Sequence, residues 1–320
     1  MVLARTIALR LVLGVVTLFV VSVLIFVATQ ALPGNAARAI LGNTATPQKV
    51  AELEAQLGLN KPVASQYMAW ISHVLAGNLG HSFVGMNQPV AQVISQPLFN
   101  SFVLVVLTAL VSVPISIGIG VYAAVKRDSL VDRVVTSGTL ALAALPEFVI
   151  GILLVVLLAT QVLHLFPPVA RPAAGVPFYR QLRELVLPVL TLTLAVFPYI
   201  SRMMRASTIE ILESDYVAMA RLKGLRERVV VWRHAVPNAI APAVQGTAMQ
   251  LAWLAGGIVA VEYLFAYPGI GSGLLSAITE RDIPVVQAIT LILATVYVLL
   301  NLAADVINIL VNPLLRTGSR

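Results

Sequence analysis

The sequence predicts an all-α membrane protein, a bundle of six transmembrane helices with an external helical segment between the first two. Of its 320 residues, 59% are hydrophobic and only 11% are charged, whereas soluble domains carry about 25% charged residues. The mean hydropathy is +0.92. Several apolar runs exceed the roughly 20 residues that a helix needs to cross a bilayer. Because the chain has no cysteine, disulfides and thiolate metal sites are excluded.

The first predicted span covers about residues 11–32. Arg5 and Arg10 precede this apolar run, which is the charge order of a secretory signal peptide. The apolar segment of such a peptide has about 7–15 residues and is shorter than this run. We therefore expect a retained first span, with a cleaved signal peptide as the alternative.

Residues 33–97 form a long polar segment, which we interpret as a small external helical subdomain. Thr46 and Pro47 open a pattern of helical periodicity that ends at Gly58, and Pro62 opens a second helix that ends before Gly77. The second helix carries tyrosine and tryptophan, which are enriched at membrane–water interfaces.

Five further apolar runs predict the remaining spans, at about residues 98–125, 134–165, 185–201, 241–265 and 285–310. The third run, which contains Pro146, is longer than a straight crossing requires. Tilt, a kink or an interfacial end would absorb the excess. Pro114 and Pro188 permit bends in the second and fourth spans.

The distribution of basic residues predicts the orientation. Six spans place both termini, the loop between spans 2 and 3, and residues 202–240 on one side. That side holds 14 of the 21 Lys and Arg residues, and the other side holds 7 in much longer loops. By the positive-inside rule the termini and residues 202–240 are cytoplasmic, and residues 33–97 lie outside. We expect a multi-pass membrane protein with both termini in the cytoplasm.

The motifs of nucleotide and metal sites are missing from the sequence. No GxxxxGK[ST] phosphate loop occurs, and the glycine-rich run at 268–273 lacks the strand that would precede a nucleotide loop. The four histidines lack the spacing of metal ligands. We therefore predict that the chain is not an enzyme and binds no cofactor, no metal and no nucleic acid.

Residues 214–237 form the most charged stretch of the chain. Ser214 is placed to cap a helix, Asp215 complements its dipole, Arg221 and Lys223 lie in its last turn, and Gly224 can end it in the left-handed conformation. A short basic helix of this kind either lies on anionic lipid or docks into a partner protein.

Glu262 lies at the end of the fifth predicted span, and two acidic residues fall within other predicted spans. Glu147 follows Pro146 in the third run, and Asp305 lies in the sixth. A charge at the bilayer centre costs about 2.5–3.5 kcal/mol, so both side chains should face the bundle interior, water or a partner. Each is a candidate for the translocation pathway or, alternatively, a structural hydrogen-bond anchor.

Several motifs in fixed order carry a family resemblance: LGLNKP at 57–62, GNLGHS at 77–82, LPEF at 145–148, DYVAMARLKG at 215–224, VEYLFAYPGIG at 261–271 and RDIPVVQ at 281–287. The whole chain resembles the permease subunit of a binding-protein-dependent ABC importer of the dipeptide/oligopeptide/nickel branch. The resemblance implies a type I importer bundle in the bacterial inner membrane. This bundle forms half of a translocation pathway for di- or oligopeptides and works by alternating access. A nickel chelate, glutathione or another small solute is the alternative, and a secondary transporter or a membrane scaffold is a more distant one.

The resemblance also implies partners and site residues. A second permease, two ATPase subunits or domains that bind ATP and Mg, and an extracytoplasmic substrate-binding protein complete such an importer. The family's EAA positions fall on Ala218, Met219 and Ala220, of which only the last agrees. The implied ATPase-docking residues are Asp215, Tyr216, Val217, Ala218, Met219, Ala220, Arg221, Lys223, Gly224, His234 and Pro237. The external segment would receive the binding protein, with Tyr67, Trp70, Gly77 and Gly80 as candidates.

Overall fold

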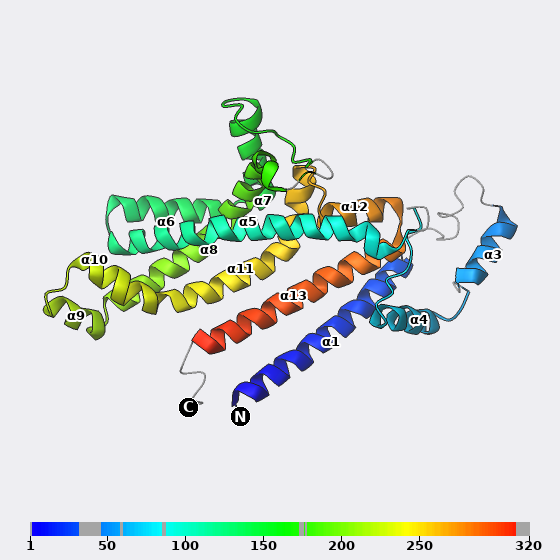
Figure 1. Cartoon of the computed structure of the whole chain (residues 1–320), viewed down its shortest axis with the longest axis horizontal. Coiled ribbons are helices and arrows are strands. Elements are labelled where there is room, and N and C mark those ends of the chain that lie inside the picture. The colour runs from blue at the N-terminus through cyan, green and yellow to red at the C-terminus, as the bar shows by residue number, and fades with distance from the viewer. Residues whose placement is uncertain are drawn as a thin grey trace. The chain divides into compact units, whose positions relative to one another are not determined.

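A computed structural model describes residues 2–31, 46–57, 60–84, 88–172, 176 and 178–311. The expected helix end at Gly58, part of the predicted external segment and the C-terminal arginines lie outside the described residues. The helices run in the order α1 Val2–Ala31, α3 Pro47–Leu57, α4 Val63–Leu75, α5 Val90–Val125, α6 Leu130–Ala143, α7 Glu147–Leu154, η2 Val155–Thr160, η3 Phe178–Arg180, α8 Leu182–Leu212, α9 Asp215–Leu222, α10 Glu227–Val229, η4 Val230–Ala235, α11 Val236–Leu264, α12 Ile270–Glu280 and α13 Ile283–Val311 (Figure 1). In this part of the chain, β-structure is limited to a bridge between His81 and Pro89.

The prediction of an all-α membrane protein is confirmed. Among the described helices, α1, α5, α8 and α13 are long and apolar enough to span a membrane, and two bent helix pairs raise the number to six if each is one span. One pair, Leu130–Ala143 with Glu147–Thr160, bends by 108°. The bend lies at Pro146, which precedes α7 with φ −59° and ψ 145°. Proline disfavours the helical conformation of the residue before it and cannot donate a backbone hydrogen bond, so the third apolar run is not one straight helix.

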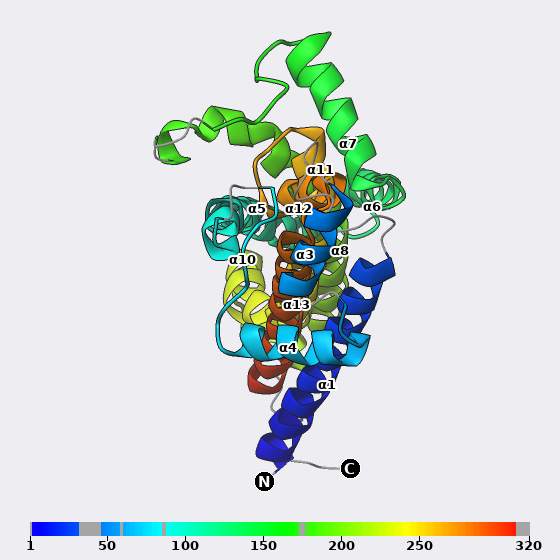
Figure 2. The same ribbon diagram turned by 90° about the vertical axis from the view of Figure 1, so that its right-hand side faces the viewer.

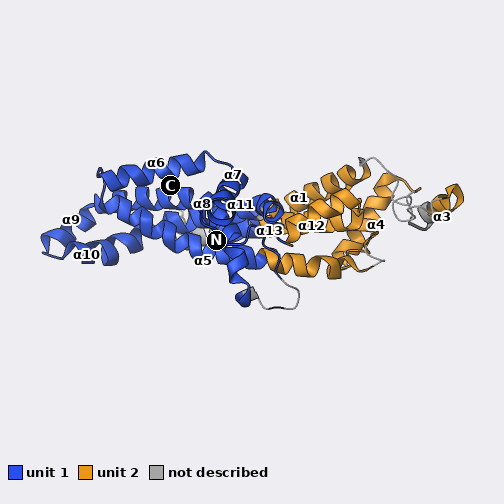
Figure 3. Ribbon diagram, turned by 90° about the horizontal axis from the view of Figure 1, so that it is seen from above, with its two compact units in different colours: residues 1–11, 102–267, 299–320 blue, residues 12–101, 268–298 orange. Residues whose placement is uncertain are grey.

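The chain divides into two compact units (Figure 3). The first comprises residues 1–11, 102–267 and 299–320. Within it, α8 contacts α6, α7 and α11. Its core contains fully buried Leu192, Ile200, Leu254 and Phe265, which come from α8, from α11 and from the end of α11. Helix α8 is therefore the central element of this unit.

Close helix packing in the first unit depends on glycine. A Cβ atom built at Gly120 of α5 would lie 2.6 Å from the Ser201 carbonyl oxygen of α8, and one built at Gly151 of α7 would lie 3.3 Å from Thr191 of α8. Small residues at such contacts let helix backbones approach closely in a membrane. Helix α8 also extends beyond its predicted span of 185–201 to Leu212, so the predicted coupling loop of 202–240 begins as helix.

The second unit comprises residues 12–101 and 268–298. Its core joins the first turns of α5 to α12 and α13 through Val90, Ile94, Ile270 and Ile289. Residues 90–97 therefore belong to α5, although the sequence pattern places them in the external segment. They continue the helix because Val90 and Ile94 fill this core.

Helix α4 lies against α1 in the second unit (Figure 2). Phe26 of α1 contacts the rings of Tyr67 and Trp70 at centroid distances of 5.5 and 5.7 Å. The Tyr67 hydroxyl also hydrogen-bonds Ser22 at 2.8 Å. This combination of ring contacts and a buried hydrogen bond fixes α4 on α1.

Candidate functional site

The predicted coupling helix is α9, Asp215–Leu222. Ser214 occupies its N-cap position with extended φ and ψ, but its hydroxyl donates to the Ile211 carbonyl at 2.6 Å instead of capping α9. The expected side-chain cap is therefore wrong, because the end of α8 offers that hydroxyl an acceptor three residues away. At the other end Gly224 has φ +74°. This is the left-handed conformation predicted for it, and it favours glycine.

One face of α9 is buried. Val217 is fully buried and Ala220 is 6% exposed, and both pack against Val230 and Ala235 of η4. A small side chain at position 220 lets α9 approach η4 closely. These two predicted docking residues thus hold the helix in place and do not face outward.

A second side of α9 is apolar and exposed. Tyr216, Met219 and Leu222 are 52%, 58% and 82% exposed. Their spacing of three residues places them along one side of a helix. The predicted docking residues Asp215, Ala218 and Lys223 are also exposed. An exposed apolar side flanked by charges is typical of a protein-binding surface.

Two polar contacts attach α9 to the segment that follows it. The Tyr216 hydroxyl lies 2.7 Å from Nδ1 of His234, and the two rings are 5.7 Å apart. The Arg221 guanidinium donates to both carboxylate oxygens of Glu227, from Nη2 at 2.7 Å and from Nε at 3.2 Å, and to the Leu212 carbonyl at 3.3 Å. The hydrogen bonds to Glu227 raise the pKa of Arg221 above its ordinary value.

The chain after α9 changes its helical pitch before Pro237. Residues Val230–Ala235 form the π-helix η4, and Pro237 falls in the first turn of α11, where its missing N–H costs little. The Asn238 side chain donates to the His234 carbonyl at 2.7 Å. Pro237 and His234 thus shape the turn from η4 into α11, and His234 also contacts Tyr216.

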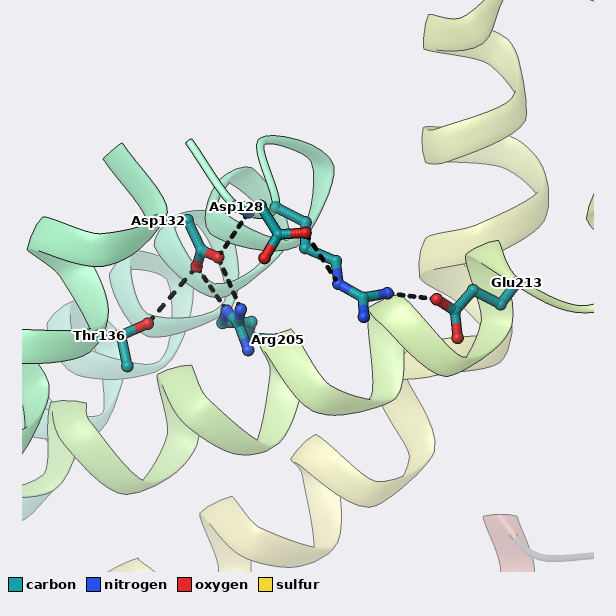
Figure 4. A network of polar contacts seen from close by, with 6 residues as sticks. Asp128, Asp132, Thr136, Arg205 and Glu213 are labelled. Atoms are coloured by element: carbon teal, nitrogen blue, oxygen red, sulfur yellow. Dashed lines mark hydrogen bonds and ion pairs between the residues drawn. The ribbon is translucent and has the colours of Figure 1, made fainter. Parts of the chain in front are cut away.

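A polar cluster that joins the α5–α6 turn and α6 to α8 was not anticipated from the sequence (Figure 4). We name it the Asp132 network; its members are Arg127, Asp128, Asp132, Thr136, Arg205 and Glu213. At its centre, Arg205 of α8 donates to Asp132 of α6 from Nε at 2.6 Å and from Nη2 at 2.7 Å. The Asp132 side chain is 6% exposed. Such paired, parallel hydrogen bonds fix the geometry of an Arg–carboxylate contact.

The Asp132 carboxylate also organises the turn between α5 and α6. It accepts the backbone N–H of Asp128 at 3.0 Å and the Thr136 hydroxyl at 3.5 Å. Ser129 caps α6 by accepting the N–H of Asp132 at 3.4 Å. The Ser-x-x-Asp spacing resembles a capping box and is the signal that could have indicated this turn.

The candidate pathway residues lie in different surroundings. Glu147 is the first residue of α7 and is partly buried, where a carboxylate complements the helix dipole. Asp305 of α13 pairs with Arg10 of α1 at 3.1 Å, with side chains 29% and 51% exposed. These contacts favour the anchor interpretation for Asp305.

The candidate docking residues of the external segment also separate into two groups. Tyr67 is 9% exposed and, with Trp70, packs on α1. Gly77 and Gly80 have φ +81° and +82°. They shape the loop after α4, in which the Asn78 side chain accepts the Gly80 N–H at 2.9 Å.

This loop meets a distant motif within the second unit. Asp282, between α12 and α13, accepts hydrogen bonds from the Ser82 hydroxyl and from the Phe83 N–H, the latter at 3.1 Å. Asp282 is 4% exposed. The GNLGHS and RDIPVVQ motifs, 200 residues apart, thus form one structural element.

Comparisons with known proteins agree with this architecture. The family model described as "Binding-protein-dependent transport system inner membrane component" matches residues 116–317, and its N-terminal companion matches residues 3–114. A probable peptide ABC transporter permease protein of Sinorhizobium fredii is 35% identical over 313 residues, covering 96% of this chain and 97% of the relative. A glutathione transport system permease protein of Salmonella typhimurium is 34% identical over 309 residues, with 96% and 98% covered. A putative peptide transport system permease protein of Brucella abortus is 34% identical over 311 residues, with 96% and 97% covered. The chain therefore belongs to the family of binding-protein-dependent transport system inner membrane components.

Proposed function

We propose that this chain is one permease half of an ATP-driven importer for di- or oligopeptides. Relatives named as peptide permeases align with nearly its full length, which supports a peptide substrate. Glutathione, itself a short peptide, is the second candidate because equally similar relatives are named glutathione permeases. The chain supplies half of the pathway and a second, homologous permease supplies the other half.

The exposed face of α9 is the observation that carries this proposal. Tyr216, Met219 and Leu222 extend from a helix whose other face is buried and whose ends are held by hydrogen bonds. A helix that is held in this way transmits a displacement to the elements it contacts. We infer that an ATPase subunit receives this face and that closure of two ATPase subunits around ATP and Mg moves α9. This chain itself binds neither ATP nor Mg.

The orientation follows from the same proposal. The termini and α9 lie in the cytoplasm, and α4 with the loop to α5 lies outside. The exposed surface around this loop, shaped by Gly77 and Gly80, receives a substrate-loaded binding protein, while Tyr67 and Trp70 hold α4 in position beneath it. Glu147 is the better candidate for the pathway, because Asp305 is already paired with Arg10.

The test is reconstitution of the complex that co-purifies with this chain. ATPase activity should rise when the loaded binding protein is added, and a labelled peptide should accumulate in vesicles only with ATP. Uptake that is driven by an ion gradient without ATP would refute the proposal. Mass spectrometry of the ligand in the co-purified binding protein distinguishes a peptide from glutathione or a nickel chelate.

A further inference from the structure

We propose that the Asp132 network joins the α5–α6 turn to the base of α9, so that the turn and α9 move together during transport. This inference rests on the proposed coupling role of α9. It assigns a positioning role to Asp132, Arg205, Arg127 and Glu213, none of which belongs to the predicted docking set. All four residues lie within the first compact unit.

The central contact is built to resist displacement. Asp132 is a buried carboxylate whose two oxygens accept the Arg205 guanidinium, an N–H of the turn and a hydroxyl of its own helix. Removing one member of a buried ion pair leaves the other charge uncompensated, so the pair does not separate readily. The turn at Asp128 therefore stays fixed to α8 at Arg205.

A second contact lies at the base of α9. Arg127, in the α5–α6 turn, forms an ion pair with Glu213. Glu213 is the C-cap residue of α8 and directly precedes Ser214, the N-cap residue of α9. A force applied to α9 is therefore passed along the chain to Glu213, and Arg127 passes it to the turn between α5 and α6.

The two contacts together restrict how the α5–α6 turn can move. Arg205 and Glu213 are eight residues apart on α8, about two helical turns, and both hold the same short turn. Two separated attachment points prevent the turn from rotating about either one. A displacement of α9 is therefore expected to move α5 and α6 along with α8.

Substitutions in the network test this in the reconstituted full complex. Asp132→Asn removes the charge of the central contact, and Arg205→Lys keeps the charge but loses the paired hydrogen bonds. Glu210→Gln is the matched control: it removes a carboxylate from α8 between Arg205 and Glu213, at an exposed position outside the network.

The readout is substrate transported per ATP hydrolysed. For Asp132→Asn and Arg205→Lys we expect ATPase stimulation to persist while this ratio falls at least about fivefold, the lower end of typical coupling between sites. Glu210→Gln should keep the wild-type ratio. An unchanged ratio in Asp132→Asn, in a complex whose wild-type form transports with ATP, would overturn the inference and leave the proposed function intact.

If complexes with Asp132→Asn or Arg205→Lys fail to assemble, the exposed ion pair between Arg127 and Glu213 tests the inference instead. Arg127→Glu and Glu213→Arg should each lower the ratio, and the double exchange should restore it, because both side chains are about half exposed and either order of charges fits. Failure of the double exchange to restore coupling counts against the inference.

Spin labels give a direct measure of joint movement. Because the chain has no cysteine, K126C and E210C introduce labels only at the turn and at the exposed side of α8. The distance between the labels should be the same in the nucleotide-free and ATP-trapped complexes. In Asp132→Asn, trapping with ATP should broaden the distribution of label distances. A change of distance in the otherwise wild-type complex would show that the turn and α8 move separately.

Discussion

The Tyr216 hydroxyl lies 2.7 Å from Nδ1 of His234, across 18 residues of the predicted coupling segment. Tyr216 belongs to α9, and His234 belongs to the π-helix that leads into α11. The contact joins the N-terminal half of α9 to η4, while the Arg221–Glu227 pair joins its C-terminal half to α10. Together with the buried face, these contacts give a short helix of eight residues a fixed place, although helices of this length are marginal alone.

Tyr216→Phe should loosen α9 without removing its ring contact with His234. The hydrogen bond contributes about 1 kcal/mol, so local opening of α9 should increase about fivefold. Hydrogen exchange of residues 214–224 in the complex without nucleotide measures this. Tyr179→Phe is the control, since Tyr179 is 58% exposed in η3. Equal exchange in both variants would show that the His234 contact does not hold α9.

Met219→Ala together with Leu222→Ala should weaken ATPase docking and leave the fold unchanged. Both side chains are exposed, and alanine keeps helix propensity, so stability of the chain should not fall. Loss of two central apolar contacts typically costs about 2 kcal/mol, or roughly 30-fold in the dissociation constant. Titration of the purified ATPase subunit onto the permease in nanodiscs measures this affinity.

The control for that pair is Leu75→Ala in α4, since Leu75 and Leu222 are each 82% exposed. It should leave ATPase affinity at the wild-type value. Docking that is unaffected by the α9 substitutions would leave α9 without its proposed partner and would favour the lipid-surface interpretation of this basic helix.

Much of α9 could be predicted from the sequence. Local signals sufficed for its start after Ser214 and for the left-handed Gly224, because both depend on neighbouring residues. The inward orientation of Val217 and Ala220 depends on Val230 and Ala235, which approach α9 only after the chain turns through η4. The sequence alone therefore could not place Val217 and Ala220 on the buried face of α9.

The contacts between distant residues could not be predicted in this way. Asp132 and Arg205 are 73 residues apart, and Ser82 and Asp282 are 200 apart. Periodicity and capping rules report only on neighbours in a helix or turn, and a basic residue near the end of an apolar run suggests the end of a span. The predicted fourth span ends at about residue 201, yet α8 continues through Arg202 and Arg205. Arg205 pairs with Asp132, and Arg202 donates to the Pro198 carbonyl at 3.1 Å.

Asp282→Asn should release the loop that follows α4. The buried carboxylate accepts from Ser82 and Phe83, and loss of its charge should cost about 1–3 kcal/mol. Hydrogen exchange of residues 77–84 should rise, and stimulation of ATPase activity by the loaded binding protein should decrease. Glu280→Gln, at an exposed position nearby in the sequence, should change neither. Unchanged exchange in Asp282→Asn would show that the loop is held by its own turns.

Gly120→Ala should destabilise the first unit, whereas Gly118→Ala in the same helix should not. A methyl group at position 120 would lie 2.6 Å from the Ser201 carbonyl oxygen and 2.9 Å from Cβ of Met204, while position 118 has nothing within 4 Å. Because the carbonyl belongs to the backbone of α8, relief requires α5 and α8 to separate, at a cost of about 1–3 kcal/mol. Alanine at position 118 instead gains about 0.5–1 kcal/mol of helix propensity. The midpoint temperatures of thermal unfolding of the two variants, measured in the same detergent, should therefore shift in opposite directions. Equal shifts would show that α5 and α8 do not approach each other at Gly120 in the membrane-extracted protein.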